Sequence, residues 1–170
     1  MGKKAYSNFI NRNQYSIKIY DYATQIGQID DCIHQMERLR EINLLENANV
    51  KFNKESLVFA VNDNKGRIYW LERGNKLAGL QHIIERHKED FQNAYGVEER
   101  DIAGFIENLV LTGEKIAERT RIKKGKITIQ QNYKYNGKLY TLNAVGTNGF
   151  IVSCYPIKEE IKIWLKLDYY

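Results

Sequence analysis

Hydrophobic residues recur along this chain with two spacings, one typical of helices and one typical of strands. Between residues 22 and 46 they return every three or four positions, which predicts an amphipathic helix over about 22–46. The recurring residues there are Ile26, Ile29, Ile33 and Met36. Just before this range, Tyr15, Ile17 and Ile19 alternate with polar residues. This alternation predicts a short strand ahead of the helix.

The middle of the chain contains a predicted hairpin followed by two predicted helices. Two apolar runs, 57–61 and 67–71, flank the polar turn 62–66, as expected for paired strands. Helical spacing of apolar residues then predicts helices over 79–93 and 98–111. The first helix would turn Leu80, Ile84, His87 and Phe91 to one face. The second would face the core with Ile102, Phe105, Ile106 and Leu109.

After Gly113 the pattern changes to that of strands. One strand is predicted to begin at Ile127, and the dipeptide Asn136-Gly137 favours a tight hairpin turn after it. Further strands are predicted over 139–145, 150–155 and 161–167. Helices followed by a run of antiparallel strands indicate an α+β fold, with N-terminal helices packed on a C-terminal antiparallel sheet. A shift in composition divides the chain into an N-terminal extension, 1–55, and a main domain, 56–170.

Charge is concentrated in one segment. The whole chain has 26 Lys and Arg against 21 Asp and Glu, a net charge of +5. From Lys115 to Lys138 there are eight cations and one acid, which gives 8 − 1 = +7, so the rest of the chain is slightly acidic. A positive segment of this density favours nucleic acid as a partner. A solvated strand edge that resists aggregation, or a face for an acidic protein, are the alternatives.

Aromatic residues alternate with the cations of this segment. Cationic side chains neutralise phosphates, and tyrosine rings stack on unpaired bases. The sequence therefore predicts an RNA-binding hairpin. Its predicted contact residues are Lys123, Lys124, Lys126, Tyr133, Lys134 and Tyr135.

The helix predicted over 79–93 contains His82, Arg86 and His87. At 100° per residue, His82 and Arg86 share a face. Imidazole transfers protons near neutral pH, and guanidinium holds phosphate oxygens, so the pair suits phosphodiester chemistry. The alternatives are a surface histidine at His82 and a partly buried core histidine at His87. The remaining histidine, His34, is interpreted as structural or solvated.

Metal and membrane sites are not expected. Zinc protease helices carry histidines four positions apart, whereas the residue four after His82 is Arg86. Cys32 and Cys154 show no zinc-ligand spacing, and free buried thiols are favoured over a disulfide. No apolar run approaches the roughly 20 residues that span a bilayer, and no apolar signal segment follows Met1. The chain is expected to act in a cytoplasm, without a cofactor.

The segment 150–155 presents hydroxyl groups on one strand face. Alternation places Ser153 and Tyr155 together and Cys154 on the opposite face. The ordinary explanation is the solvent side of an edge strand. The alternative is a polar site.

Three features in this order are a histidine-containing helix, a basic hairpin and a last strand. The helix begins Gly79-Leu80-Gln81-His82-Ile83-Ile84-Glu85-Arg86-His87, and the strand ends Ile151-Val152-Ser153-Cys154-Tyr155-Pro156. Together they resemble the barnase–EndoU–colicin–RelE group of nucleases. They are most similar to phage-associated and contact-dependent-inhibition toxins, over about 65–167. The resemblance implies metal-independent RNA cleavage through a 2′,3′-cyclic phosphate.

The resemblance also implies roles for individual residues. His82 or His87 would act as general base or acid, and Arg86 would hold the phosphate. Thr147 and Tyr155 would assist at the phosphate or in proton transfer. The catalytic lysine of EndoU-like members has no motif here, so Lys124, Lys126 and Lys134 stay open as candidates. The expected substrate is tRNA, rRNA or message, and the expected protein partner is an acidic cognate immunity protein. A non-catalytic nucleic-acid-binding module of the same fold is the alternative.

Overall fold

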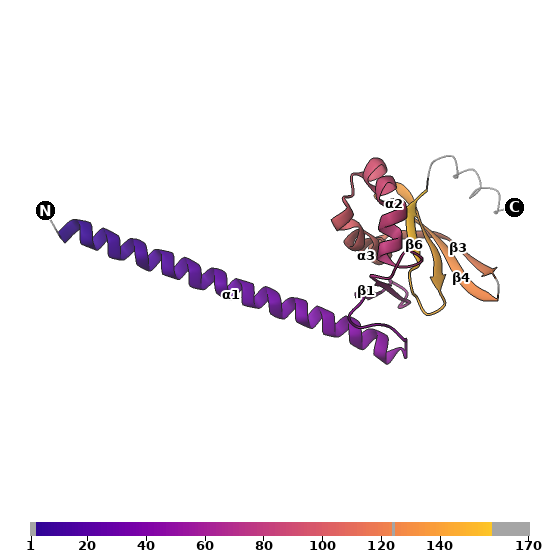
Figure 1. Cartoon of the computed structure of the whole chain (residues 1–170), viewed down its shortest axis with the longest axis horizontal. Coiled ribbons are helices and arrows are strands. Elements are labelled where there is room, and N and C mark those ends of the chain that lie inside the picture. The colour runs from indigo at the N-terminus through magenta and orange to yellow at the C-terminus, as the bar shows by residue number, and fades with distance from the viewer. Residues whose placement is uncertain (1–2, 124, 158–170) are drawn as a thin grey trace. The chain divides into compact units, whose positions relative to one another are not determined.

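The computed structural model describes the backbone of residues 3–123 and 125–157, and side chains from residue 24 onward within these ranges except Lys123. The chain folds into an α+β structure with helices and two antiparallel sheets (Figure 1). By its internal contacts it divides into two units, 1–40 and 41–170. Among the described residues, no helix is long and apolar enough to cross a membrane.

Helix α1 runs from Lys3 to Asn47 and forms the whole described part of the first unit. The predicted helix 22–46 is confirmed, but the predicted strand over 15–19 is wrong, because this stretch belongs to α1. The spacing from Tyr15 to Ile19 is four residues, which fits a helix as well as it fits alternation. The short pattern was ambiguous, and the continuous helix that follows decided it.

The last turns of α1 belong to the second unit. Leu45 is fully buried and packs with Leu57, Ala60 and Trp70 in a small apolar cluster. The division by internal contacts falls after Arg40. The boundary predicted from the composition shift is near residue 55. Burial of Leu45 makes the end of the helix part of the main domain's packing.

Strands β1 (Leu57–Asn62) and β2 (Ile68–Glu72) form the predicted hairpin and pair antiparallel. The turn between them is held by Asp63, whose carboxylate accepts the backbone N–H groups of Lys65 and Arg67, each at 2.9 Å. Such side-chain acceptors fix a tight turn locally. The hairpin also bonds to a distant loop, where Trp70 donates its backbone N–H to Gly149 at 3.1 Å.

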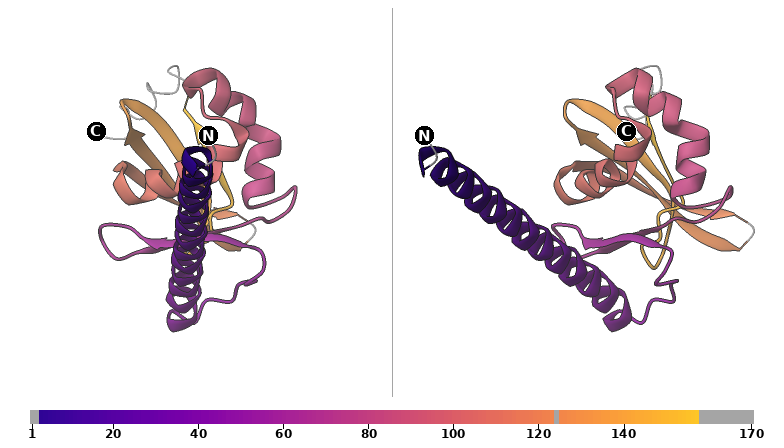
Figure 2. Two further views of the ribbon diagram at one scale, coloured as in Figure 1. Left: turned by 90° about the vertical axis from the view of Figure 1, so that its left-hand side faces the viewer. Right: turned by 60° about the vertical axis from the view of Figure 1, so that its left-hand side comes forward.

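Helices α2 (Leu80–Tyr95) and α3 (Ile102–Thr112) confirm the two helices predicted in this region. A 3₁₀ turn, Glu99–Asp101, leads into α3. Ile83 and Phe91 of α2 are fully buried, and α3 buries four apolar residues. Figure 2 shows the two helices lying against the strands. Their buried residues share one core with β1, β2 and the larger sheet.

The larger sheet has four antiparallel strands in the order β3-β4-β5-β6. Its strands are β3 (Glu114–Lys123), β4 (Lys126–Tyr135), β5 (Lys138–Gly146) and β6 (Ser153–Pro156). The turn at Asn136-Gly137 is confirmed, with both residues at positive φ. The strand predicted to begin at residue 150 begins at Ser153 instead, because Phe150 bridges to Trp70 of the small sheet. The strand predicted over 161–167 lies outside the described residues.

Candidate functional site

The imidazole of His87 stacks on the phenol ring of Tyr155, with ring centroids 4.8 Å apart and planes tilted by 31°. His87 follows the buried Ile83 by one helical turn on α2, and Tyr155 lies on the edge strand β6. The backbone N–H of Gly79, which precedes α2, donates to Val152 at 3.1 Å. This bond fixes the start of the helix beside the strand and brings the two rings together.

His87 has a carboxylate on its other side. Its Nδ1 lies 3.2 Å from Asp90, three residues along the helix. A carboxylate there favours a proton on Nδ1 and leaves Nε2 as the nitrogen that accepts a proton. The side chain is 21% exposed, so solvent reaches it. His87 is therefore held between Asp90 and Tyr155 and is partly open to solvent.

Strand pairing places a row of polar side chains on the sheet face opposite the apolar core. Tyr155 pairs with Thr141, and Thr141 pairs with Asn132. Ser153 and Asn143 form the next pair on the same face. The Thr141 hydroxyl donates a hydrogen bond to the side-chain oxygen Oδ1 of Asn132 at 2.7 Å. The hydroxyls predicted to share a face, Ser153 and Tyr155, do so, but Ser153 is buried rather than solvated.

Tyr155 keeps its proton at neutral pH. Burial raises the pKa of its hydroxyl above the ordinary value, and the positive charge of Arg121 opposes this only in part. Arg121 is an exposed residue of β3, at the opposite edge of the sheet from β6. The contact that the structure gives at this point therefore joins an imidazole from α2 to a phenol from β6.

Among the described residues, the structure gives no contact between the other proposed catalytic residues and the His87–Tyr155 pair. His82 bonds through Nδ1 to the backbone oxygen of Lys76 at 2.9 Å. Arg86 is exposed and makes no polar contact with any residue that the structure describes. Thr147 is exposed in the turn between β5 and β6. Tyr155 lies about five residues along the ladder from that turn, roughly 16 Å at 3.3 Å per residue.

The two tyrosines predicted to stack on bases, Tyr133 and Tyr135, lie on the core side of β4. Tyr133 is 2% exposed and belongs to the core, and Tyr135 packs edge-on against Phe105 at 5.4 Å. Alternation along β4 turns these rings inward and Lys134 outward. The alternation of cations and aromatic residues in this segment therefore reflects a strand with one face toward the core and the other toward solvent.

The cations of the hairpin remain available to a ligand. Lys126 and Lys134 are exposed, as are Arg119 and Arg121 on β3. Arg119 and Arg121 pair with Gln130 and Thr128, which puts them on the polar face of the sheet. The side chain of Lys123, and Lys124 as a whole, lie outside the described residues. The two arginines were counted in the basic segment but not assigned to the site, although their spacing of two predicted a common face.

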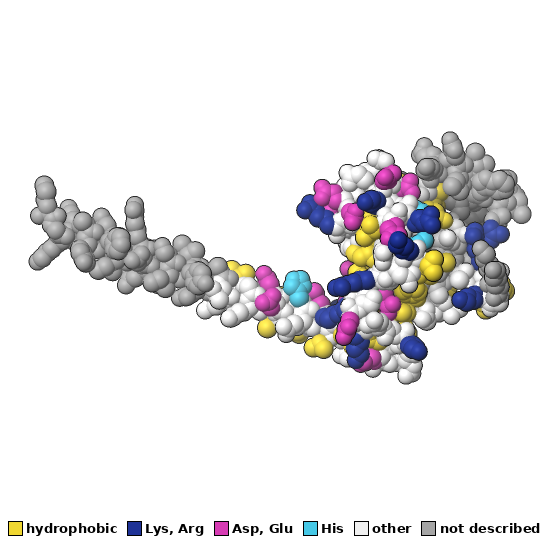
Figure 3. All heavy atoms as spheres, in the orientation of Figure 1, with side chains coloured by type: hydrophobic (Ala, Val, Ile, Leu, Met, Phe, Trp, Pro, Cys, Tyr) yellow, Lys and Arg dark blue, Asp and Glu magenta, His cyan; other side chains and the backbone are white. Residues whose placement is uncertain are grey.

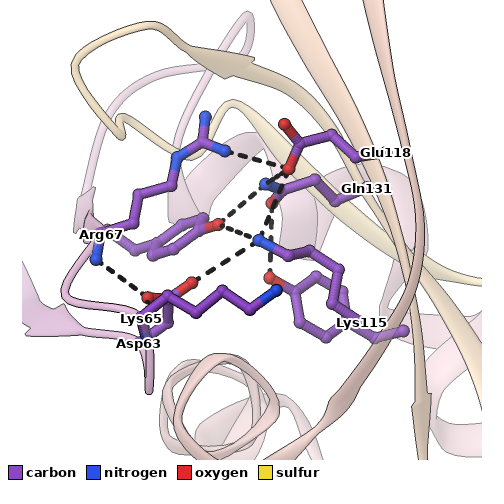
Figure 4. Close-up of polar contacts among 8 residues, drawn as sticks. Asp63, Lys65, Arg67, Lys115, Glu118 and Gln131 are labelled. Atoms are coloured by element: carbon purple, nitrogen blue, oxygen red, sulfur yellow. Dashed lines mark hydrogen bonds and ion pairs between the residues drawn. The ribbon is translucent and has the colours of Figure 1, made fainter.

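A second polar group, missed by the sequence reading, joins the small hairpin to the sheet (Figure 4). Its residues, here called the polar cluster, are Asp63, Arg67, Tyr69, Lys115, Glu118 and Gln131, with Lys65 and Tyr133 beside them. They adjoin a hollow of about 520 Å³.

The polar cluster is a network of paired charges. Arg67 lies 3.0 Å from Glu118, and Lys115 lies 3.5 Å from Glu118 and 3.6 Å from Asp63. Gln131 donates to both Tyr69 and Glu118 at 2.8 Å. Two cations therefore meet two carboxylates, and their charges cancel.

Lys115 and Glu118 stay charged at neutral pH. Burial alone would lower the pKa of Lys115, but Tyr69 and the two carboxylates outweigh it, and the pKa is raised. Burial alone would raise the pKa of Glu118, but the Gln131 hydrogen bond and the neighbouring cations lower it. Neither group is poised to exchange a proton near pH 7. The cluster is suited to hold the hairpin on the sheet.

Among the described residues, no group of three or more His, Cys, Asp or Glu is placed to hold a metal ion. Both cysteines are free, with Cys154 buried as expected and Cys32 exposed, contrary to expectation. Compared with known proteins, the chain matches no protein-family model and no curated sequence.

Proposed function

We propose that this protein is a metal-independent endoribonuclease that cleaves RNA by attack of a 2′-hydroxyl on the adjacent phosphate. The observation that carries this proposal is the stacking of His87 on Tyr155 beside a polar sheet face. The resemblance of the histidine helix and the last strand to the barnase–EndoU–colicin–RelE group supports the same reaction.

The proposed chemistry assigns one task to each group. Nε2 of His87 takes the proton of the 2′-hydroxyl, and the resulting oxygen attacks phosphorus. The bond to the 5′-oxygen breaks as that oxygen takes the proton of the Tyr155 hydroxyl, and the proton held by His87 then returns to the tyrosine oxygen. Arg121 stabilises the negative charge that develops on the phosphate. The products are a 2′,3′-cyclic phosphate and a 5′-hydroxyl.

Substrate binding is proposed to rest on the exposed cations. Arg119, Arg121, Lys126 and Lys134 offer positive charge to the RNA backbone. The same face suits an acidic immunity protein, which would inhibit the enzyme by covering it. His82 and Arg86 are proposed to contact RNA from the same helix rather than to share the proton-transfer site.

The test is cleavage of a mixed RNA substrate by purified protein in the presence of EDTA, with the product ends identified. His87→Ala and Tyr155→Phe are each expected to lower the rate, by about 10²–10⁴ for the histidine. His34→Ala, at an exposed position on α1, is the matched control and should cleave like the parent. Thermal unfolding of each variant checks that the fold is retained.

Three outcomes would contradict the proposal in distinguishable ways. Unchanged cleavage by folded His87→Ala would show that the site is assigned wrongly. Cleavage that EDTA abolishes and a divalent metal restores would show a different mechanism. RNA that is bound but stays intact would favour the non-catalytic binding module.

A further inference from the structure

Helix α1 carries an exposed apolar stripe that the proposed nuclease site does not use. Ile26, Ile29, Ile33 and Met36 are 49%, 57%, 47% and 71% exposed. Apolar side chains are visible along the described stretch of the helix in Figure 3. A helix outside a core gains most of its stability by packing such a face. We therefore expect the stripe to pack against another apolar surface.

The spacing of the stripe identifies the kind of partner. Steps of three and four residues alternate without interruption from Ile26 to Met36. In the sequence the same register continues back through Ile19 and Tyr22, and it stops at Arg40. A sustained period of 3.5 residues is the pattern by which one helix packs along another in a coiled coil.

The flanking residues indicate that the partner helix is identical and parallel. With Ile26 and Ile33 at heptad position a, and Ile29 and Met36 at d, the e positions carry Asp30 and Glu37. The preceding g positions carry the uncharged Gln25 and Cys32. In a parallel pair, e faces g of the other chain, so each acid faces an uncharged side chain. In an antiparallel pair, e faces e, and acids would oppose acids.

We propose that the protein self-associates through a parallel coiled coil of α1, with the stripe of one copy packed against that of another. This association is independent of the proposed nuclease activity. Its consequence is that two or more copies of the main domain are held in one complex. Such linking raises the effective concentration of their RNA-binding faces.

The first test is sedimentation equilibrium of the full chain. The parent should have a mass that is a multiple of 20.0 kDa. The double variant Ile29→Asp, Ile33→Asp should weaken association by at least about 100-fold, because it buries unpaired carboxylates in the seam. The matched control Gln28→Asp, Gln35→Asp adds the same charge on the outer face and should associate like the parent. Circular dichroism establishes that each variant is folded.

The second test measures orientation. In a Cys32→Ser background, spin labels at Gln28→Cys or Gln35→Cys should each give one short interchain distance if the helices are parallel. In an antiparallel pair, the two labels at one position are displaced along the helix axis by twice the distance of that position from the point where the helices cross. Because positions 28 and 35 are seven residues apart, their two displacements sum to at least about 21 Å at 1.5 Å per residue. A parent of 20.0 kDa at all soluble concentrations, equal association of the seam and control variants, or antiparallel distances would each overturn the proposal.

Discussion

The ammonium group of Lys115 lies 3.6 Å from the carboxylate of Asp63 and joins strand β3 to the turn of the β1–β2 hairpin. Asp63 is 5% exposed through its side chain, and it also accepts two backbone N–H groups of its own turn. One carboxylate therefore fixes the shape of the hairpin turn and its attachment to the larger sheet.

Replacing this carboxylate should destabilise the protein. Asp63→Ala leaves two backbone donors without their acceptor and removes one of the two carboxylates beside Lys115, and we expect a loss of about 2–3 kcal/mol in unfolding free energy. The control Asp101→Ala removes a side chain that is 62% exposed, with a cation at 3.7 Å. It should change stability by less than about 0.5 kcal/mol. Urea unfolding of both variants compares the two losses, and equal losses would show that Asp63 is not a structural anchor.

Glu118 should make stability depend on acid pH. Its folded-state pKa is lowered below the ordinary value of 4.5, so its contribution to stability is complete above that value and is lost as pH falls through the folded pKa. Between pH 5 and pH 3 the parent should therefore lose more unfolding free energy than Glu118→Gln. The measurement is urea unfolding at a series of pH values. Parallel curves for the two proteins would contradict the expectation.

Gly149 should be intolerant of a side chain. Its φ is +89°, and a Cβ there would lie 2.1 Å from the backbone oxygen of Ile68. That oxygen belongs to strand β2 and cannot move without disturbing the sheet. Gly149→Ala should therefore cost more than about 3 kcal/mol, beyond ordinary φ strain.

Gly66 offers the matched control for this substitution. Its φ of +77° is similarly strained for alanine, but nothing lies within 4 Å of the added Cβ. Gly66→Ala should cost about 1 kcal/mol. Thermal unfolding of both variants separates the effect of the clash with the Ile68 oxygen from the effect of a positive φ on alanine. A similar loss of stability at both positions would show that the backbone oxygen of Ile68 does not exclude a side chain at position 149.

Arg119 and Arg121 should set the salt dependence of RNA binding. If both contact phosphates of single-stranded RNA, removing them lowers the slope of log K against log salt by about 1.4, at roughly 0.7 per contact. Arg119→Gln, Arg121→Gln should therefore bind more weakly and with a shallower slope. Arg100→Gln is the control, because Arg100 is exposed but lies 2.9 Å from Glu98. Filter binding with His87→Ala protein avoids cleavage, and an unchanged slope in the double variant would exclude these contacts.

Much of the secondary structure follows from sequence alone. Helices α2 and α3, the hairpin of β1 and β2, and the turn at Asn136-Gly137 are all set by local spacing and turn chemistry. The α+β arrangement follows from the order of these elements. Local patterns are sufficient where the buried face of an element repeats over several turns or strand positions.

Short patterns were decided by their surroundings. Tyr15 to Ile19 fits a strand or a helix, and the continuous α1 makes it helical. Tyr133 and Tyr135 have the composition of a base-stacking surface, yet the core lies on their side of β4. Which face of a strand is buried depends on what packs against the sheet, and this information lies elsewhere in the chain.

The sequence by itself determined the helical and strand periods, the concentration of positive charge and the presence of histidines on α2. Only the tertiary structure decided that His87, rather than His82, meets Tyr155, and that Asp63 and Glu118 share Lys115. The physical reason is distance along the chain. Spacing relates residues within one helix or strand, whereas these contacts join separate elements, and only the packing of the whole core sets which side chains meet.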